Sequence, residues 1–371
     1  MHFVGKKLAV PFLVIALTAG LAACGSSSDS SSDSSSSSGG GKKIALLLPE
    51  TKTARYESQD KPLIEKYIKQ DCPDCEVLYS NADQDTSKQQ SQVEAAITEG
   101  ANAIILDPVD AEAAGAMVAR ANQANIPVIS YDRLVSNAAV DYYVSFDNVK
   151  VGELQGTTMA ANLKKEGNAT GPIVKINGSP TDPNAGQFKE GSDKALADAG
   201  VKVAKSYDTP DWSPDKAQTE MEQAATALGK DGFTGVYAAN DGTAGGAIAA
   251  LQGAGIDPGT MSVTGQDAEL TAIQRIIAGQ QFMTVYKAID PEAKAAAQLA
   301  IAVANGDSAP SGLVNGKTDN GSGQIPSVLL EPVAVTKDNV NDTIVKDGFW
   351  SASEICTPAY KKDCEAAGIS G

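Results

Sequence analysis

Polar side chains that could bind a hydroxyl-rich molecule follow several short apolar segments of this chain. They are Arg55 and Tyr56 after the first segment and, after later segments, Asp107, Asp132, Arg133, Asn240, Asp241, Gln266, Asp267 and Lys287. Taken singly, an Asp or Asn at such a position usually caps a helix or forms a turn. Taken together, the set combines Arg and Lys donors with carboxylate acceptors and an amide. Each hydroxyl of a polyol both donates and accepts hydrogen bonds, so these residue types favour a polyol-binding site.

Two aromatic residues in polar surroundings could cover the apolar C–H face of such a ligand. Aromatic residues make up only 5% of the chain. Tyr56 lies beside Arg55, and Trp212 lies in the loop sequence Asp-Trp-Ser-Pro. Aromatic rings offer a large apolar surface of this kind. A place in the hydrophobic core is the alternative for Trp212.

The distribution of histidine disfavours an enzyme. The chain contains one histidine, His2, and it lies in an N-terminal segment that is predicted to be removed. The mature protein would then lack the Ser-His-Asp and Cys-His arrangements of nucleophilic enzymes and any histidine-ligated metal. We therefore predict no catalysis, no cofactor and no metal site. A glycosidase that uses paired carboxylates is the remaining enzymatic alternative.

The N-terminal segment has the pattern of a secretory signal followed by a tether. Two lysines precede the apolar run 8–17, and small residues lead to Cys24, so 1–23 is predicted to be a signal peptide. The sequence Leu-Ala-Ala-Cys resembles the bacterial lipobox, in which the cysteine is lipidated. Residues 24–42, mostly Ser, Asp and Gly, would form a flexible tether to the outer face of the cell membrane. An ordinary secreted protein with a buried Cys24 is the alternative.

Length and charge narrow the class of protein further. Residues 24–371 exceed the roughly 250–300 residues at which a single hydrophobic core stops growing, which predicts two lobes. The net charge of −16 opposes nucleic acid binding, which needs basic patches. It favours an acidic, soluble surface.

Besides Cys24, four cysteines form two close pairs, Cys72 with Cys75 and Cys356 with Cys364. An oxidising compartment permits disulfides, and pairing within each close pair is the simplest of the three connectivities. A redox-active Cys-x-x-Cys at Cys72 and a four-cysteine zinc site are the alternatives. Cys72 is expected in a helix-to-strand loop rather than at a helix start after a strand, which opposes the redox alternative.

Alternating strands and helices must position these side chains. Strands are expected at 44–48, 77–79, 103–106, 128–131, 173–176, 201–206, 235–238, 261–264, 282–286 and 328–330, and helices at 61–69, 87–99, 111–125, 149–164, 185–199, 215–228 and 243–254. Strands that are apolar throughout predict an α/β fold with parallel sheets covered on both faces, and their number suggests two such lobes. In open parallel sheets, ligands bind beyond the carboxyl ends of the strands, which is where the polar set lies.

Several sequence blocks resemble the periplasmic xylose-binding proteins. They are Val-Ile-Ser-Tyr-Asp-Arg-Leu-Val at 128–135, Tyr-Val-Ser-Phe-Asp-Asn-Val-Lys-Val-Gly-Glu-Leu-Gln at 143–155, Gly-Ser-Pro-Thr-Asp-Pro-Asn-Ala at 178–185, Ala-Asn-Asp-Gly-Thr-Ala-Gly-Gly-Ala-Ile at 239–248, and Met-Thr-Val-Tyr-Lys at 283–287. This family belongs to the ribose-type sugar-binding proteins of ABC importers, which are type I periplasmic binding proteins. The resemblance implies two Rossmann-like three-layer lobes joined by a three-segment hinge. Their expected ranges are 43–146 plus 288–328 for the N-terminal lobe, and 147–287 plus 329–371 for the C-terminal lobe and tail.

The resemblance also implies a ligand pocket and adds two residues to those that follow the strands. The implied pocket comprises Arg55, Tyr56, Asp132, Arg133, Asp182, Asn184, Trp212, Asn240, Asp267 and Lys287. Asp182 and Asn184 are the additions, because Ser-Pro-Thr-Asp-Pro-Asn by itself indicates a plain turn. The implied function is that of a monomeric lipoprotein that captures an aldose and delivers it to the membrane subunits of an ABC permease. D-xylose is the first candidate for this aldose.

Two features depart from the xylose binders. Tyr56 stands where they usually carry tryptophan, and the tail from Pro326 is closer to relatives that bind several aldoses, including glucose. A glucose or multiple-monosaccharide binder is therefore an alternative. A sugar receptor for a membrane signalling partner is another, since docking surfaces cannot be identified from this sequence. A sugar-responsive repressor would need a helix-turn-helix before residue 43, where the chain has the signal and the tether.

Overall fold

Residues 41–369 are described by a computed structural model, and residues 1–40 and 370–371 lie outside the described part. The predicted signal peptide, the lipidation site Cys24 and most of the predicted tether therefore lie outside the described residues. Within residues 41–369, no helix combines the length and the apolar character that crossing a membrane requires.

The first sheet has seven strands in the order β11-β12-β5-β4-β3-β1-β2, and all neighbours are parallel except β11 with β12. The strands are β1 (Lys43–Leu48), β2 (Glu76–Asn81), β3 (Ala103–Leu106), β4 (Val128–Tyr131), β5 (Tyr142–Phe146), β11 (Gly316–Asp319) and β12 (Gln324–Leu330). The central strands β1, β3 and β4 are buried along almost their whole length. Their continuous apolar sequences suit a sheet that is covered on both faces.

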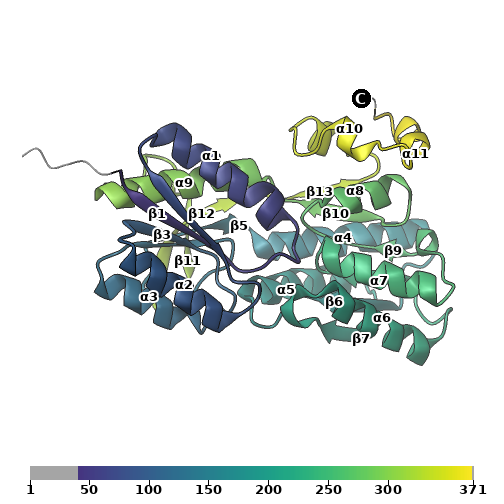
Figure 1. The fold of residues 1–371 in the computed structure, drawn as a ribbon. Helices are drawn as coiled ribbons and strands as arrows, with labels where there is room; N and C mark the ends of the chain where they lie inside the picture. Colours follow the sequence, from purple (N-terminus) through teal and green to yellow (C-terminus); the bar gives the residue numbers. More distant parts are fainter. Residues whose placement is uncertain (1–40, 370–371) are drawn as a thin grey trace, which may run out of the picture. The chain divides into compact units, whose positions relative to one another are not determined.

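Helices cover both faces of the first sheet because successive side chains of a strand point to opposite faces. Leu46 of β1 packs in a hydrophobic cluster with one pair of helices, and Leu47 packs in a second cluster with another pair. The first pair is α1 (Lys61–Asp71) and α9 (Ile289–Asn305), and the second is α2 (Thr86–Thr98) and α3 (Ala114–Gln123). The two pairs lie on opposite sides of the sheet (Figure 1).

The second sheet has four parallel strands in the order β7-β6-β8-β9, and a separate antiparallel pair joins β10 to β13. These strands are β6 (Ile173–Asn177), β7 (Val203–Asp208), β8 (Gly235–Ala238), β9 (Ser262–Val263), β10 (Met283–Tyr286) and β13 (Val333–Thr336). The neighbouring helices are α4 (Asn148–Lys165), α5 (Pro183–Asp198), α6 (Pro214–Leu228), α7 (Asp241–Gly253) and α8 (Leu270–Ile277). Helices α6 and α7 share one apolar cluster with β6 and β8, and α4 and α5 share another.

The C-terminal segment, residues 341–369, packs against α8. Its short helices are η4 (Asn341–Val345), α10 (Ala352–Ile355) and α11 (Lys361–Ala366), and the other short helical turns of the chain are η1 (Tyr56–Asp60), η2 (Pro210–Trp212) and η3 (Pro258–Thr260). Ile344 and Ile355 are fully buried in one apolar cluster with Ile273 and Ile277 of α8. Figure 1 shows α10 and α11 next to α8.

Both close pairs of cysteines are disulfides in the structure. Cys72 is bonded to Cys75 in the turn between α1 and β2, and Cys356 at the end of α10 is bonded to Cys364 of α11. This local pairing leaves no free thiolate among the described cysteines for a zinc site.

The structure confirms the predicted α/β class with parallel sheets flanked by helices. The chain passes between the first sheet and the second group of strands at three places, from β5 to α4, from β10 to α9 and from β12 to β13. The exact lobe boundaries given above stay a prediction.

Several elements of the structure have no counterpart among the predicted ones. They are the strands β5, β11 and β13 and the helices α8, α9, α10 and α11, besides the short helical turns. Helix α9 is rich in alanine and buried on much of its surface, so its sequence lacks a clear polar face. Helix α8 is only 8 residues long, which is short for a pattern that repeats every 3.6 residues.

Candidate functional site

Loops at the carboxyl ends of strands from both sheets meet around one small cavity. It contains about 260 Å³ of space that protein atoms do not occupy, its mouth included. The lining consists of Thr53, Arg55, Tyr56, Asp132, Arg133, Asp182, Asn184, Phe188, Trp212, Asn240, Gln266, Asp267 and Lys287. The structure thus brings together all ten residues that the sequence analysis assigned to a pocket. It adds Thr53, Phe188 and Gln266, of which Gln266 already belonged to the set that follows the strands.

The backbone of Asp132, the residue after β4, is held in an unusual conformation. Its φ angle of 54° lies in the left-handed region, which costs a non-glycine residue about 1–3 kcal/mol. Its carbonyl oxygen accepts hydrogen bonds from the Tyr143 hydroxyl at 3.0 Å, the Ser145 hydroxyl at 2.8 Å and the Asn184 amide at 3.0 Å. These three bonds offset the strain and fix the direction of the Asp132 side chain.

The carboxylates of Asp132 and Asp267 share two cations. Lys287 Nζ lies 3.1 Å from Asp267 Oδ1 and 3.6 Å from Asp132 Oδ1. Arg55 Nη2 lies 3.2 Å from Asp132 Oδ1, and Arg55 Nη1 lies 3.9 Å from Asp267 Oδ1. The Tyr56 hydroxyl also donates to Asp132 Oδ2 at 2.8 Å. One charge network therefore joins loops that follow strands of the first sheet to loops of the second group.

A second network centres on Asp182, which caps the start of α5. Its Oδ1 accepts from the Asn184 backbone N–H at 2.8 Å. Its Oδ2 lies 3.0 Å from Arg133 Nε and accepts from Trp212 Nε1 at 3.0 Å. A helix-capping aspartate thus also links Arg133, which follows β4, to the tryptophan that follows β7.

Trp212 belongs to the hydrophobic core and also lines the cavity. Its ring packs edge-to-face with Phe188, with 6.3 Å between the ring centroids. Gly178 allows this position, because a Cβ atom there would lie 2.0 Å from Trp212 Cη2. Two guanidinium groups lie close to the Tyr56 ring, with their carbons 5.1 Å (Arg55) and 5.6 Å (Arg133) from its centroid.

Four buried carboxyl groups outside the cavity lining hold the two guanidinium groups. Arg55 Nη2 lies 3.0 Å from Asp60 Oδ1 and 3.6 Å from Glu292 Oε2. Arg133 lies 3.6 Å from both Glu50 and Asp107. Glu50, Asp60 and Glu292 are not among the residues predicted from the sequence, while Asp107 is in the set that follows the strands. No local motif identifies the first three, because their contacts depend on distant parts of the chain.

The charges of the cavity reinforce one another. Burial would raise the pKa of Asp132, but the charges of Arg55 and Lys287 outweigh burial and hold this pKa below its usual range. Burial and Arg55 both act to lower the pKa of Lys287, but Asp132 and Asp267 outweigh them and raise it. Asp132 and Lys287 are therefore charged at neutral pH.

Several buried polar atoms of the lining have no hydrogen-bond partner within the protein. They are Nε and Nη1 of Arg55, Nε of Arg133, Oδ1 of Asp132, Oδ1 of Asp267 and Oε1 of Gln266. Some of these atoms lie at ion-pair distance from opposite charges, but without the geometry of a hydrogen bond. Because buried polar groups are normally paired, this set can serve a ligand whose groups both donate and accept.

The remaining predicted residue, Asn240, has a structural role as well as its place in the lining. Its Oδ1 caps α7 by accepting from the Thr243 backbone N–H at 2.9 Å. Among residues 41–369, no group of three or more Cys, Asp or Glu side chains could hold a metal ion.

Comparison with known proteins identifies the family. A family profile described as "Periplasmic binding protein domain" matches residues 44–308. The D-xylose-binding periplasmic protein of Haemophilus influenzae is 37% identical over 317 residues, which cover 84% of this chain and 92% of that protein. The protein of the same description from Escherichia coli is 36% identical with the same coverage.

A solved structure agrees with this match. It is an ABC transporter solute-binding protein from Clostridium phytofermentans with bound β-D-glucose, with a TM-score of 0.76 and 29% identity, and the match covers 85% of this chain and 100% of that one. The chain therefore belongs to the periplasmic binding protein family, a class of solute-binding proteins that are not enzymes.

Proposed function

We propose that this protein captures an aldose, D-xylose, in the cavity and delivers it to an ABC importer. The observation that carries the proposal is the lining itself, in which buried donors of Arg55 and Arg133 and acceptors of Asp132, Asp267 and Gln266 have no partner within the protein. Each hydroxyl of a sugar needs both kinds of partner. The two D-xylose-binding relatives support xylose as the first choice.

The proposed mechanism is closure of two lobes around the sugar. Arg55 and Asp132 belong to the predicted N-terminal lobe, 43–146 plus 288–328, and Asp267 belongs to the predicted C-terminal lobe, 147–287 plus 329–371. A ligand that touches both sides stabilises the closed arrangement, whereas a ligand that touches one side does not shift the equilibrium. The rings of Tyr56 and Trp212 would pack on apolar C–H groups of the sugar.

A glucose or multiple-monosaccharide binder is the second candidate, and specific observations favour it. Tyr56 offers a smaller ring than the tryptophan that xylose binders usually carry. The solved relative from Clostridium phytofermentans holds β-D-glucose. A multiple sugar-binding periplasmic receptor from Rhizobium radiobacter is 35% identical over 290 residues, which cover 74% of this chain and 81% of that protein. Because that relative is described as a receptor, a role as a sugar receptor for a membrane signalling partner is the alternative to transport.

The proposed setting is the outer face of the cell membrane, where a monomeric protein is anchored through lipid on Cys24 and meets the permease subunits. This part rests on the sequence pattern that ends at Cys24. Metabolic labelling with a fatty acid tests it, since the natural chain should take up label and the Cys24→Ala variant should not.

Titration calorimetry with D-xylose, D-glucose and other aldoses tests the proposed ligand. Micromolar affinity corresponds to about −8 kcal/mol. Asp267→Ala leaves Lys287 with a weaker partner and should abolish measurable binding, because breaking a buried charge pair costs about 2–5 kcal/mol. Asp198→Ala, on the exposed surface of α5, is the matched control and should bind like the natural protein. Failure of every aldose to bind, or full affinity in Asp267→Ala, would contradict the proposal.

A further inference from the structure

The loop between β9 and α8 carries Gln266 and Asp267 of the cavity in a strained conformation. The φ angles are 94° at Asp267 and 52° at Ala268, so two successive non-glycine residues lie in the left-handed region. Such residues persist only when the surrounding structure imposes them. Strand β10 supplies two restraints: Asp267 N–H donates to Val285 O at 2.9 Å, and Ala268 N–H donates to the Thr284 hydroxyl at 3.2 Å.

A third restraint on this loop comes from the C-terminal segment. Trp350 Nε1 donates to the carbonyl oxygen of Ala268 at 2.8 Å. Its neighbour Phe349 packs edge-to-face on Tyr286 with 5.1 Å between ring centroids. Ala268 directly follows Asp267, and Tyr286 directly precedes Lys287. The two adjacent aromatic residues therefore hold the chain next to both members of the Asp267–Lys287 ion pair, whose charged atoms are 3.1 Å apart.

The same aromatic pair also reaches the loop after β1. The Phe349 carbonyl oxygen accepts from Gln59 Nε2 at 3.3 Å. Gln59 belongs to η1, which begins at the cavity residue Tyr56. Phe349 and Trp350 thus contact three of the segments that carry the cavity, yet neither residue lines it.

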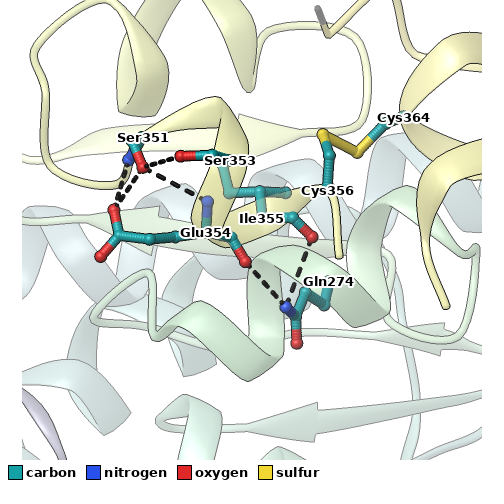
Figure 2. The surroundings of a disulfide bond; sticks show 7 residues. All are labelled: Gln274, Ser351, Ser353, Glu354, Ile355, Cys356 and Cys364. Atoms are coloured by element: carbon teal, nitrogen blue, oxygen red, sulfur yellow. Dashed lines mark hydrogen bonds between the residues drawn. A yellow bond between two sulfur atoms is a disulfide. The ribbon is translucent and has the colours of Figure 1, made fainter. Parts of the chain in front are cut away.

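The rest of the C-terminal segment is fixed on α8, which begins just after the strained loop. Gln274 of α8 donates to the carbonyl oxygens of Glu354 and Ile355 at 3.3 and 3.4 Å (Figure 2). Ser351 and Glu354 cap α10 reciprocally, and the disulfide between Cys356 and Cys364 links the end of α10 to α11 (Figure 2). The segment therefore forms a fixed base for Trp350 rather than a loose tail.

We propose that Trp350 and Phe349 are positioning residues of the sugar site and act as a clamp that keeps Asp267 aligned with Lys287, with the rest of residues 341–369 as their base. The inference rests on the proposed sugar binding. It assigns a purpose to a C-terminal region that lies outside the matched family domain, which ends at residue 308.

Trp350→Phe tests the clamp because it keeps an apolar ring but removes the N–H donor to Ala268. Loss of one neutral hydrogen bond corresponds to about a three- to tenfold weaker affinity for D-xylose, or for the aldose that the natural protein binds best. Ile344→Val is the matched control, since it removes one buried methyl group from the same segment and leaves the Trp350–Ala268 hydrogen bond in place. It should lower the melting temperature and leave the affinity within twofold.

Hydrogen exchange of the sugar-free protein gives a readout that does not depend on any ligand. The amides of Asp267, Ala268 and Glu269 should exchange faster in Trp350→Phe than in the natural protein, and they should be unchanged in Ile344→Val. Equal exchange in all three proteins would overturn the inference. It would also be overturned if both variants lost affinity in proportion to their drop in melting temperature. If the natural protein binds no aldose, the proposed function fails, and the exchange pattern still decides whether Trp350 holds the loop.

Discussion

The ion pair of Lys287 with Asp267 predicts a strong and non-additive effect of mutation. At 3.1 Å and an effective dielectric constant of about 20, the two charges attract by about 5 kcal/mol. Lys287→Met removes the cation and leaves Asp267 with Arg55 at 3.9 Å as its nearest positive charge. Removing one partner of a buried pair costs about 3–5 kcal/mol, so we expect the free energy of unfolding to fall by that amount.

The double variant Lys287→Met/Asp267→Asn separates a buried-charge effect from a loss of packing. Asp267→Asn alone should cost less than Lys287→Met, because Lys287 keeps Asp132 at 3.6 Å. The double variant no longer buries an uncompensated carboxylate at residue 267, so its stability loss should be smaller than the sum of the single losses by about 2 kcal/mol or more. None of the three variants should bind sugar measurably, because both residues line the cavity.

Urea unfolding followed by tryptophan fluorescence provides the stabilities for this cycle, and calorimetry provides the affinities. Independent sites add within about 0.3–0.5 kcal/mol. Stability losses that add within that margin would refute the reasoning, because they would mean that the two charges do not interact in the folded protein.

Two further predictions concern pH and packing. Burial raises the pKa of Asp241 to about 7, and burial together with the charge of Asp241 raises that of Glu269 to about 8. An acid whose pKa is higher in the folded than in the unfolded protein binds more protons when the protein is folded. The free energy of unfolding should therefore fall as the pH rises from about 4 to 8. In the Asp241→Asn variant, urea unfolding should show a smaller fall over the same pH range. Gly178→Ala should displace Trp212, cost about 1–3 kcal/mol in the same assay and weaken sugar binding. Gly186→Ala, in an open position of α5, should be neutral or stabilising, and equal losses in the two glycine variants would contradict the packing argument.

The polar residues that follow strands could be predicted from sequence because parallel strands bring their carboxyl ends to one edge. Asp132 comes directly after an expected strand, Asn240 one residue further on and Asp267 two residues further on, and the structure places them in the same cavity. Asp182 and Asn184 lie at the start of α5, where an Asp-Pro-Asn sequence has an ordinary capping role. Spacing alone could not distinguish that role from ligand binding, and the family resemblance supplied these two residues.

The buried carboxyl groups that hold the arginines could not be predicted in this way. Glu292 lies in the first turn of α9, where an acidic residue is expected simply because it suits the helix dipole. Asp60 lies in η1 within an otherwise polar stretch. Each carboxyl group gains its partner only when segments far apart in the chain pack together. The same holds for Trp350, whose contact with Ala268 spans 82 residues.

These carboxyl groups give a physical reason to expect a neutral ligand. Arg55 is fixed by Asp60 at 3.0 Å and Glu292 at 3.6 Å as well as by Asp132, so its guanidinium group is oriented by the fold itself. An arginine side chain loses up to about 2 kcal/mol of rotamer freedom when it is fixed, and here folding rather than binding bears that cost. Burial also raises the pKa of Asp60 and Glu292, which favours their neutral forms and limits the excess of negative charge around Arg55. A neutral aldose adds no charge to this balance, whereas an anionic or cationic ligand would place a new charge in a buried cavity whose charges are already paired.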